Sequence, residues 1–318
     1  MNIVLLERST LGMDVSLDCF ADFGNLTSYD TTRPDQIEER IKDADIVMIN
    51  KSPMNESTLK NAKNLKYIGE FATGYDNVDI EYCKSRGIRV TNVSGYSTDA
   101  VAQHTFAMAL YVMEHLRHYD DYVKSGDYIK SDNFSYFGKT FNELAGKRWG
   151  IMGLGNIGRK VAGIAKAFGC EVVYYSSTGS HEDKEYERVS LDELLETSDV
   201  LSIHCPLTEK TRYIINKDTL AKMKKSAILI NAGRGPIVNN SDLYDALVNN
   251  VIAGAGLDVL DGEPMKADNP LKDFKDSDRL IITPHMAWAS VEARNRCVQS
   301  AYDNVKAFLN KEERNVIV

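Results

Sequence analysis

The sequence predicts an α/β protein built from two doubly wound parallel sheets. Short runs rich in β-branched and aromatic residues alternate with helical patterns along the chain, which is typical of βαβ units. The alternation is interrupted once, near residue 97, by a helical pattern that is too long and too apolar for a linker. With 318 residues, the chain is long enough for about two domains.

Composition and charge narrow the range of partners. The chain is 43% hydrophobic and 26% charged, which indicates a globular protein rather than a disordered or fibrous one. A formal net charge of -8 disfavours nucleic acid and anionic membranes, because both bind to basic surfaces. The five cysteines are widely spaced and fit neither a disulfide framework nor a metal site. Without a leader pattern or a membrane-length apolar run, the sequence predicts a cytoplasmic protein that binds no metal.

The first series of predicted strands ends at a long helix. Its strands are NIVLLE at 2–7, ADIVMIN at 44–50, KYIGEFA at 66–72 and IRVTNV at 88–93. The helix begins with Ser97 or Thr98 as its N-cap and continues to about residue 123, with an apolar face along its length. We place the crossing between the two domains on this helix.

The second series begins with RWGIMGLG at 148–155. Its later strands are EVVYYSS at 171–177, DVLSIHCP at 199–206, AILINAG at 227–233, AGAGLDV at 253–259 and RLIITPH at 279–285. The final helical pattern, at 290–310, is too short to form a domain and is expected to pack on the first one. We therefore expect one domain from residues 1–97 completed by 288–318, and a second from residues 98–287.

A glycine-rich turn follows the first strand of the second series. Gly153, Gly155 and Gly158 form GxGxxG between a strand and a helix, and a further strand follows. The first glycine permits a tight turn, the second lets the backbone approach a pyrophosphate, and the third lets helix and strand pack closely. The turn predicts a dinucleotide site in which helix N-terminal amides, including those of Asn156 and Ile157, hold the phosphates.

The end of the next strand leaves the choice of dinucleotide open. An NAD site has an acidic residue there, which binds the ribose hydroxyls, but this strand ends in Ser176 and Ser177. Serine removes the repulsion that would exclude a 2′-phosphate. However, no arginine follows directly to bind that phosphate, so both NAD and NADP remain candidates.

A histidine ends the last predicted strand of the second series. Within TPHMAWAS at 283–290, His285 is either a proton-transfer group or a core histidine with only a structural role. The residue alone does not decide between these interpretations.

Several stretches resemble the D-isomer-specific 2-hydroxyacid dehydrogenase family. They are ILINAGRGPIVNNSDLYDAL at 228–247, AGAGLDVLDGEP at 253–264 and ITPHMAWAS at 282–290. The resemblance extends through FATGYDNVDIEYCKSRGIRVTNVSGYSTDAVAQHTFAMAL at 71–110 to nearly the whole chain. Within the family, the chain is most similar to hydroxypyruvate reductases, also called glycerate dehydrogenases. The resemblance implies a Rossmann-type nucleotide domain inserted into a smaller flavodoxin-like substrate domain.

The resemblance also places Arg234, Glu263 and His285 in one active site. An arginine can hold the carboxylate of a 2-oxo acid and polarise its carbonyl group, and a histidine can donate the proton. A carboxylate can orient the protonated imidazole ring. Taken singly, Arg234 and Glu263 are more readily interpreted as surface charges than as catalytic residues. Together, in this order and with a dinucleotide turn, they indicate catalysis.

Further residues are assigned to ligands by the same resemblance. Asp258 is expected to bind the nicotinamide carboxamide, and two strand-end loops to line the cofactor: Cys205 with Pro206, and Ala232 with Gly233. In the first domain, the backbone of Thr73 and Gly74 is expected to bind the substrate carboxylate. Lys51 either adds positive charge to this site or is a solvated surface lysine. Trp288 either caps the substrate pocket or is a core or interface tryptophan.

We therefore expect an NAD- or NADP-dependent oxidoreductase that transfers a hydride between the cofactor and a small 2-oxo or D-2-hydroxy acid. Hydroxypyruvate with D-glycerate, or glyoxylate with glycolate, are the expected pairs, and family resemblance suggests a homodimer. Two alternatives remain open: a dinucleotide-sensing scaffold without catalysis, and a reductase of another 2-oxo acid, such as pyruvate or a phosphorylated acid.

Overall fold

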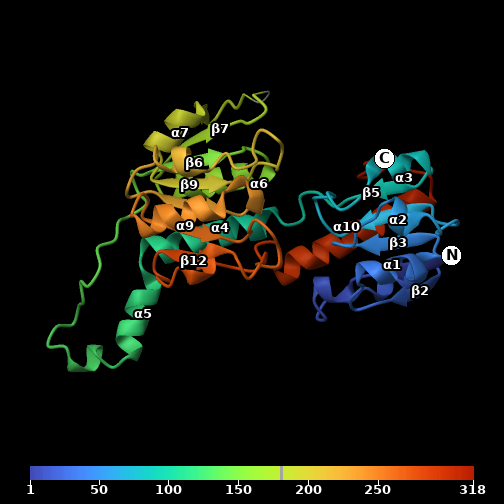
Figure 1. Cartoon of the computed structure of the whole chain (residues 1–318), viewed down its shortest axis with the longest axis horizontal. Helices are drawn as coiled ribbons and strands as arrows, with labels where there is room; N and C mark the ends of the chain where they lie inside the picture. Colours follow the sequence, from blue (N-terminus) through green and yellow to red (C-terminus); the bar gives the residue numbers. More distant parts are fainter. Residues whose placement is uncertain (180–181) are drawn as a thin grey trace. The chain divides into compact units, whose positions relative to one another are not determined.

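The computed structural model describes residues 1–179 and 182–318, and its contacts divide the chain into two compact units (Figure 1). Unit 1 comprises residues 1–97 and 288–318, and unit 2 comprises residues 98–287. Each unit contains one parallel sheet. The described residues include no helix with the length and apolar character needed to cross a membrane.

Unit 1 is built on a five-stranded parallel sheet. Its strand order is β2-β1-β3-β4-β5, which is the flavodoxin-like order and confirms the predicted fold of this unit. The strands are β1 (Asn2–Leu5), β2 (Asn25–Ser28), β3 (Ile46–Ile49), β4 (Tyr67–Glu70) and β5 (Arg89–Thr91). The helices are α1 (Pro34–Ile41), α2 (Glu56–Leu59), α3 (Ile80–Ser85) and α10 (Val291–Leu309), with 3-10 turns at Arg8–Leu11 and Asp18–Phe23.

Alternating side chains of this sheet contact helices on both faces. Val47, Ile68 and Val90 belong to a buried cluster with residues of α1, α2 and α3. Tyr67 points to the opposite face, where its ring centroid lies 4.8 Å from that of Phe308 at the end of α10. The last residues of the chain continue the edge of the sheet, because the amide of Val90 donates to the carbonyl of Val318 at 2.8 Å.

Unit 2 is built on a seven-stranded parallel sheet. Its order is β12-β11-β10-β9-β6-β7-β8, the Rossmann arrangement with one further strand, which confirms the second predicted fold. The strands are β6 (Arg148–Met152), β7 (Glu171–Tyr175), β8 (Glu187–Arg188), β9 (Val200–Ile203), β10 (Ile228–Asn231), β11 (Gly254–Leu257) and β12 (Leu280–Ile282).

Helices cover both faces of this second sheet. On one face, α4 (Thr98–Met113) and α6 (Asn156–Ala167) bury Trp149, Tyr174 and Ile230. On the other face lie α7 (Leu191–Thr197), α8 (Lys217–Leu220) and α9 (Asn240–Val248), with 3-10 turns at Gly235–Ile237 and Pro270–Asp273. Because all strands of this sheet are parallel, their carboxyl ends lie at one edge, where an open α/β sheet binds ligands.

The long helix expected from residue 97 to about 123 is divided in two. α4 ends at Met113, and α5 (Leu116–Lys124) begins after His115, whose φ of 52° lies in the left-handed region. This conformation changes the direction of the chain and ends α4. The sequence pattern did not predict the break because the apolar residues continue past it.

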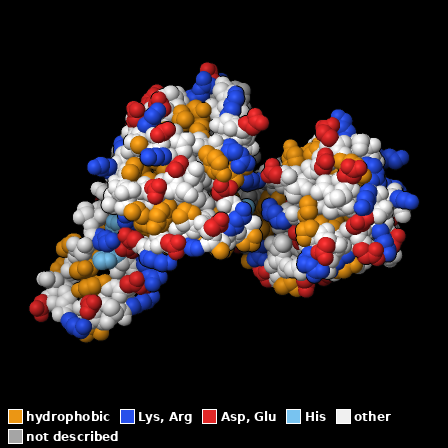
Figure 2. Space-filling model, viewed as in Figure 1, with side chains coloured by type: hydrophobic (Ala, Val, Ile, Leu, Met, Phe, Trp, Pro, Cys, Tyr) orange, Lys and Arg blue, Asp and Glu red, His pale blue; other side chains and the backbone are white. Residues whose placement is uncertain are grey.

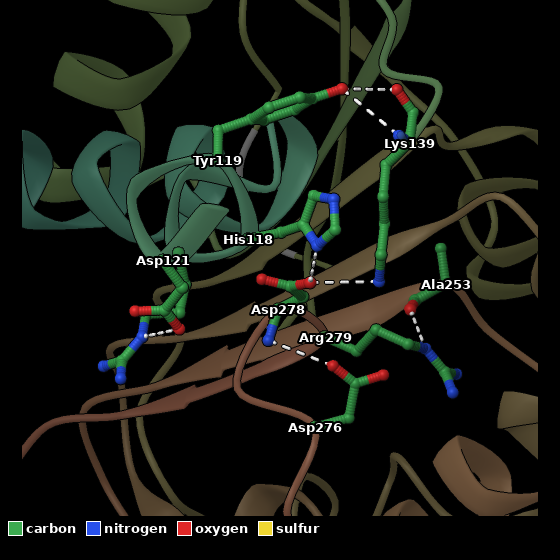
Figure 3. Close-up of polar contacts among 9 residues, drawn as sticks. His118, Tyr119, Asp121, Lys139, Ala253, Asp276, Asp278 and Arg279 are labelled. Carbon is green, nitrogen blue, oxygen red and sulfur yellow. Dashed lines mark hydrogen bonds and ion pairs between the residues drawn. The ribbon is translucent and has the colours of Figure 1, made fainter. Parts of the chain in front are cut away.

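An arm formed by residues 116–141 follows this break and includes α5 and a 3-10 turn at Tyr128–Lys130 (Figure 1). The base of the arm is attached to unit 2 through Asp278, whose Oδ2 lies 3.0 Å from Lys139 Nζ and 3.9 Å from His118 Nδ1 (Figure 3). Tyr119 Oη donates to the carbonyl of Lys139 at 2.5 Å. Further along the arm, Ile129 and Phe134 are about nine-tenths exposed. Hydrophobic side chains are visible on the arm surface in Figure 2.

Candidate active site

The glycine-rich turn of unit 2 has the close packing that its sequence predicts. Gly153 has a φ of 97°, and a Cβ there would lie 2.7 Å from the backbone of Cys205. A Cβ on Gly158 would lie 2.2 Å from the carbonyl oxygen of Gly153, so only glycine lets α6 approach this turn. Around Gly155, at the N-cap of α6, a Cβ would meet no atom within 4 Å. The turn therefore has open space beside the first amides of α6, at Asn156 and Ile157, which fits a dinucleotide phosphate.

Two predicted cofactor loops lie side by side next to this turn. A Cβ on Gly233 would be 3.3 Å from the carbonyl oxygen of Cys205, so the loop containing Ala232 and Gly233 contacts the loop containing Cys205 and Pro206. Burial raises the pKa of the Cys205 thiol to about 11, which keeps it protonated at neutral pH. The preceding His204 is held neutral because burial lowers its pKa to about 3. These loops contribute shape rather than charge to the site.

The end of β7 places Ser176 and Ser177 in half-exposed positions after the strand. Ser176 Oγ lies 3.3 Å from the hydroxyl of Thr178. From the neighbouring β8, Arg188 donates to the carbonyl of Gly179 at 2.9 Å, so an arginine does contact this loop. Sequence reasoning missed it because Arg188 is separated from Ser176 by twelve positions and reaches the loop only through the pairing of β7 with β8.

Glu263 and His285 form a hydrogen-bonded pair. Glu263 Oε2 lies 2.7 Å from His285 Nδ1, and the two side chains are 36% and 30% exposed. The other carboxylate oxygen, Oε1, accepts from the amide of Leu260 at 2.9 Å. Since Nδ1 is bound to the carboxylate, Nε2 is the nitrogen available to a reacting molecule. An oriented, partly exposed imidazole is the arrangement that general acid–base chemistry requires.

Asp258 fixes the loop that contains His285. It is 2% exposed, and its carboxylate accepts from the amides of Met286 and Ala287 at 2.8 and 2.9 Å. Its backbone carbonyl also accepts from the amide of His285 at 2.8 Å, where His285 has a φ of 54°. These bonds hold the histidine in its left-handed conformation. The predicted contact of Asp258 with a nicotinamide carboxamide remains a prediction.

Two residues that the sequence analysis did not select extend this hydrogen-bond network. Thr283 Oγ1 donates to Asp258 Oδ1 at 2.6 Å, and His104 Nε2 from α4 lies 2.9 Å from the same threonine hydroxyl. Thr283 belongs to TPHMAWAS at 283–290 and His104 to the stretch at 71–110, so both lie in stretches that resemble the family. Their support of Asp258 depends on the packing of α4 against β11 and β12, which the sequence pattern does not predict.

Arg234 follows β10, the strand next to β11. Its Nη1 donates to the carbonyl of Gly233 at 3.0 Å, and Asn231 Nδ2 donates to the carbonyl of Arg234 at 3.0 Å. Gly235 lies so close to the carbonyl of Leu260 that a side chain could not fit between them. Arg234, Glu263 and His285 therefore follow three adjacent parallel strands, at the edge that also contains the glycine turn.

The predicted substrate residues of the first domain lie in unit 1. Thr73 Oγ1 donates to the carbonyl of Val93 at 2.9 Å, and Asn92 Nδ2 donates to the carbonyl of Thr73 at 2.7 Å, which fixes the loop that includes Gly74. Lys51 has an exposed side chain and an amide that donates to Glu7 Oε2 at 2.9 Å. Trp288 is half-buried, with its ring 6.2 Å from that of Tyr96 in an edge-on arrangement.

Comparison with known proteins identifies the chain. The family model "D-isomer specific 2-hydroxyacid dehydrogenase, NAD binding domain" matches residues 106–287. A hydroxypyruvate reductase of Blautia hydrogenotrophica is 38% identical over 100% of this chain and 99% of its own length. A glycerate dehydrogenase of Methylorubrum extorquens is 38% identical over 99% and 98%. The crystal structure of D-lactate dehydrogenase from Aquifex aeolicus, complexed with NAD and lactic acid, has a TM-score of 0.88 at 30% identity, with 100% and 99% coverage.

The Rossmann sheet, the glycine turn and the histidine–carboxylate pair define a nicotinamide dinucleotide-dependent oxidoreductase. The comparisons specify it further: the chain belongs to the D-isomer specific 2-hydroxyacid dehydrogenase family. Its members transfer a hydride between the cofactor and a 2-oxo or D-2-hydroxy acid, so the enzyme class expected from the sequence is confirmed.

Proposed function

We propose that this enzyme reduces a small 2-oxo acid to the D-2-hydroxy acid, with hydroxypyruvate or glyoxylate as the preferred substrate. The 2.7 Å contact between His285 and Glu263 is the observation that carries this proposal. The names of the relatives, hydroxypyruvate reductase and glycerate dehydrogenase, support the substrate class. When bound, the nicotinamide supplies the hydride for the carbonyl carbon.

His285 is the proposed proton donor. Its protonated Nε2 would give a proton to the carbonyl oxygen of the substrate as that oxygen becomes an alkoxide, while Glu263 holds Nδ1 and stabilises the ring's positive charge. In the oxidative direction, the neutral ring would accept the proton from the hydroxyl group. Arg234 would bind the substrate carboxylate and polarise the carbonyl, because a guanidinium group offers two parallel donors.

Unit 1 is proposed to supply the remaining substrate contacts. The amides of Thr73 and Gly74 would bind the carboxylate, and Lys51 would add positive charge beside it. Trp288 would limit the size of the group attached to the 2-oxo carbon. Residues 98–287 are proposed as the dinucleotide domain, and residues 1–97 with 288–318 as the substrate domain.

We propose that both NADH and NADPH are used. Ser176 has no charge that would repel a 2′-phosphate, and Arg188 is bound to the same loop. Within the cofactor site, the glycine turn, the two flanking loops at 205–206 and 232–233, and Asp258 would contact the dinucleotide. The proposal of dual use is supported by the chemistry of this loop and is tested by assays with each cofactor.

We propose a homodimer in the cytoplasm. Ile129, Phe134 and Phe137 on the arm are at least 88% exposed, and burying each such side chain would contribute about 1.5–3 kcal/mol. We propose that a second copy of the chain buries these three side chains of the arm. Sedimentation velocity should show a dimer, and a double variant with Phe134→Ser and Phe137→Ser should shift the equilibrium towards the monomer.

The proposed cytoplasmic location is supported by the cysteines. All five are free, which agrees with a reducing compartment.

A panel of 2-oxo acids, assayed with NADH and NADPH separately, tests the proposed function. We expect the highest kcat/KM for hydroxypyruvate or glyoxylate, and measurable turnover with both cofactors. A preference for pyruvate or a phosphorylated acid would contradict the substrate assignment. Dinucleotide binding without turnover of any 2-oxo acid would indicate the sensing scaffold instead.

A further inference from the structure

Unit 1 contains a buried glutamate that the proposed mechanism does not use. Glu70 is the last residue of β4, and it is 1% exposed. It directly precedes the loop with Thr73 and Gly74. Burial holds the pKa of Glu70 well above its ordinary value, and its Oε1 has no hydrogen-bond partner within residues 1–179 and 182–318. Burial of this kind favours the protonated, neutral form of a carboxyl group.

Glu70 is joined to both proposed substrate loops of unit 1 by a single amide. Asn77 Nδ2 donates to Glu70 Oε2 at 3.1 Å and to the carbonyl of Ser52 at 3.0 Å. The first bond closes the base of the loop at 71–76, and the second attaches it to the loop that contains Lys51. A change in the charge of Glu70 would therefore act on both loops.

The surroundings of Glu70 contain more negative than positive charge. Lys51 attracts the ionised form of Glu70, whereas Glu7 and Asp76 repel it. From α10, Cys297 donates its thiol to the carbonyl of Phe71 at 3.3 Å, and burial raises the pKa of that thiol, so it contributes no charge. If Glu70 were ionised, three carboxylates would lie near one lysine at a site proposed for an anion.

Glu7, a neighbouring carboxylate of unit 1, differs from Glu70 in the number of hydrogen bonds that it accepts. Its Oε2 accepts from the amides of Asn50, Lys51 and Ser52, each at 2.9 Å. Three such donors stabilise a negative charge. Among the described residues, Glu70 accepts from one amide group, that of Asn77, and it is more deeply buried than Glu7. Desolvation therefore has the largest effect on the pKa of Glu70 and raises it.

We propose that Glu70 is a positioning residue that must be neutral for the enzyme to bind its anionic substrate. As the neutral acid, it anchors Asn77 and leaves the field of Lys51 uncancelled. As a carboxylate, it would weaken the attraction of Lys51 for the substrate. It would also change the hydrogen bond that Asn77 Nδ2 donates to Glu70 Oε2. This proposal depends on the assignment of Lys51, Thr73 and Gly74 to the substrate carboxylate.

The first consequence is a rise of KM with pH that is independent of the pH dependence of kcat. If only the form with neutral Glu70 binds substrate, KM rises about tenfold for each pH unit above the ionisation of Glu70. Glu70→Gln keeps a neutral side chain at every pH, so its KM should stay within about twofold of the neutral-pH value of the wild type. The exposed Glu81 on α3 provides the matched control, because Glu81→Gln should retain the wild-type rise.

Steady-state kinetics with hydroxypyruvate from about pH 6 to pH 10 test this consequence. A Glu70→Gln enzyme that keeps the alkaline rise in KM would overturn the proposal. So would a KM that is about tenfold higher in Glu70→Gln at neutral pH, since this would mean that the charge of Glu70 is needed.

A measurement without turnover separates this proposal from the proposed function. In enzyme with ¹³C-labelled glutamate, the carboxyl signal absent from Glu70→Gln should have the chemical shift of a neutral acid at neutral pH. Oxalate, used as an anionic probe in calorimetry, should lose affinity with rising pH in wild type but not in Glu70→Gln. An ionised Glu70 signal overturns the proposal. If that signal is neutral and the oxalate result holds, but no 2-oxo acid is reduced, only the proposed function fails.

Discussion

Glu263 in unit 2 and Glu70 in unit 1 have the same side chain in opposite environments. Glu263 is one-third exposed and 2.7 Å from a histidine ring, whereas Glu70 is buried with a single amide donor. Desolvation raises the pKa of Glu70 and favours its neutral form, whereas Glu263 has the His285 ring as a hydrogen-bond partner. The comparison teaches that burial and hydrogen-bond partners, rather than the type of side chain, decide which form of a carboxyl group is favoured. In the proposed roles, Glu263 stabilises a cation, and Glu70 helps to accommodate an anion by being neutral.

The largest effect is expected from removing the histidine that Glu263 holds. His285→Ala should lower kcat for 2-oxo acid reduction by roughly 10²–10⁴-fold, because the developing alkoxide loses its proton donor. Fluorescence titration should show that NADH binding persists, since the glycine turn is unchanged. Near-wild-type turnover in the folded variant would exclude His285 as the proton donor.

Glu263→Gln is expected to have the second largest effect on activity. The amide keeps the shape but not the charge, so we expect kcat at neutral pH to fall by roughly tenfold or more. The pH profile of reduction should move to lower pH, because the protonated ring loses its ionic partner. Stopped-flow rates over a pH series measure this shift. A profile that does not move would show that Glu263 does not act on His285.

Arg234→Lys keeps the positive charge and loses the planar pair of donors. We expect both KM and kcat for the 2-oxo acid to worsen, each by about tenfold, because binding and polarisation depend on the same group. Initial-rate kinetics at saturating NADH give both constants. If the lysine variant equals wild type, Arg234 is a surface cation.

Ser176→Asp introduces a carboxylate at the end of β7, where the wild type has a serine. Repulsion of the 2′-phosphate should raise the preference for NADH over NADPH by at least about tenfold in kcat/KM. Ser176→Asn is the neutral control and should change the ratio little. A wild type that already rejects NADPH by several orders of magnitude would mean that a group outside this loop selects the cofactor.

The smallest effect concerns stability. The native state keeps a proton on Glu70 that the unfolded chain releases, so the free energy of unfolding falls as pH rises from about 4.3 to the folded-state pKa. Glu70→Gln lacks this decline. Over that interval the variant should gain up to about 1.4 kcal/mol relative to wild type for each pH unit. Urea unfolding at several pH values measures the difference, and parallel curves for the two proteins would contradict a neutral Glu70.

Much of the fold could be predicted from the sequence because most strands are buried and apolar. The two missed strands are β2 and β8, whose mostly exposed, polar residues give no hydrophobic pattern. The end of α4 was missed because it depends on the left-handed conformation of His115 rather than on a glycine or proline. Apolar periodicity does not record such a break.

For the candidate site, the sequence predicted the motif residues but not the residues that support them. Arg234, Glu263 and His285 lie in motifs, and parallel strands bring their ends to one edge. Asp258, Thr283 and His104 support the His285 loop from three separate segments. Contacts between distant segments cannot be predicted from the spacing of residues along the chain. Glu70 lies inside a run predicted as a strand, but its burial could not be anticipated, since carboxylates are seldom fully buried.

The contrast between the two glutamates is tested most directly by measuring kcat and KM for hydroxypyruvate over one pH series in wild type, Glu263→Gln and Glu70→Gln. The account predicts that the two constants vary separately with pH: KM rises with the ionisation of Glu70, and kcat depends on the His285–Glu263 pair instead. Glu263→Gln should move the profile of kcat, and Glu70→Gln should abolish only the rise in KM. If Glu70→Gln moved the profile of kcat, or if both constants followed a single ionisation in all three enzymes, the separate roles of the two carboxyl groups would be contradicted.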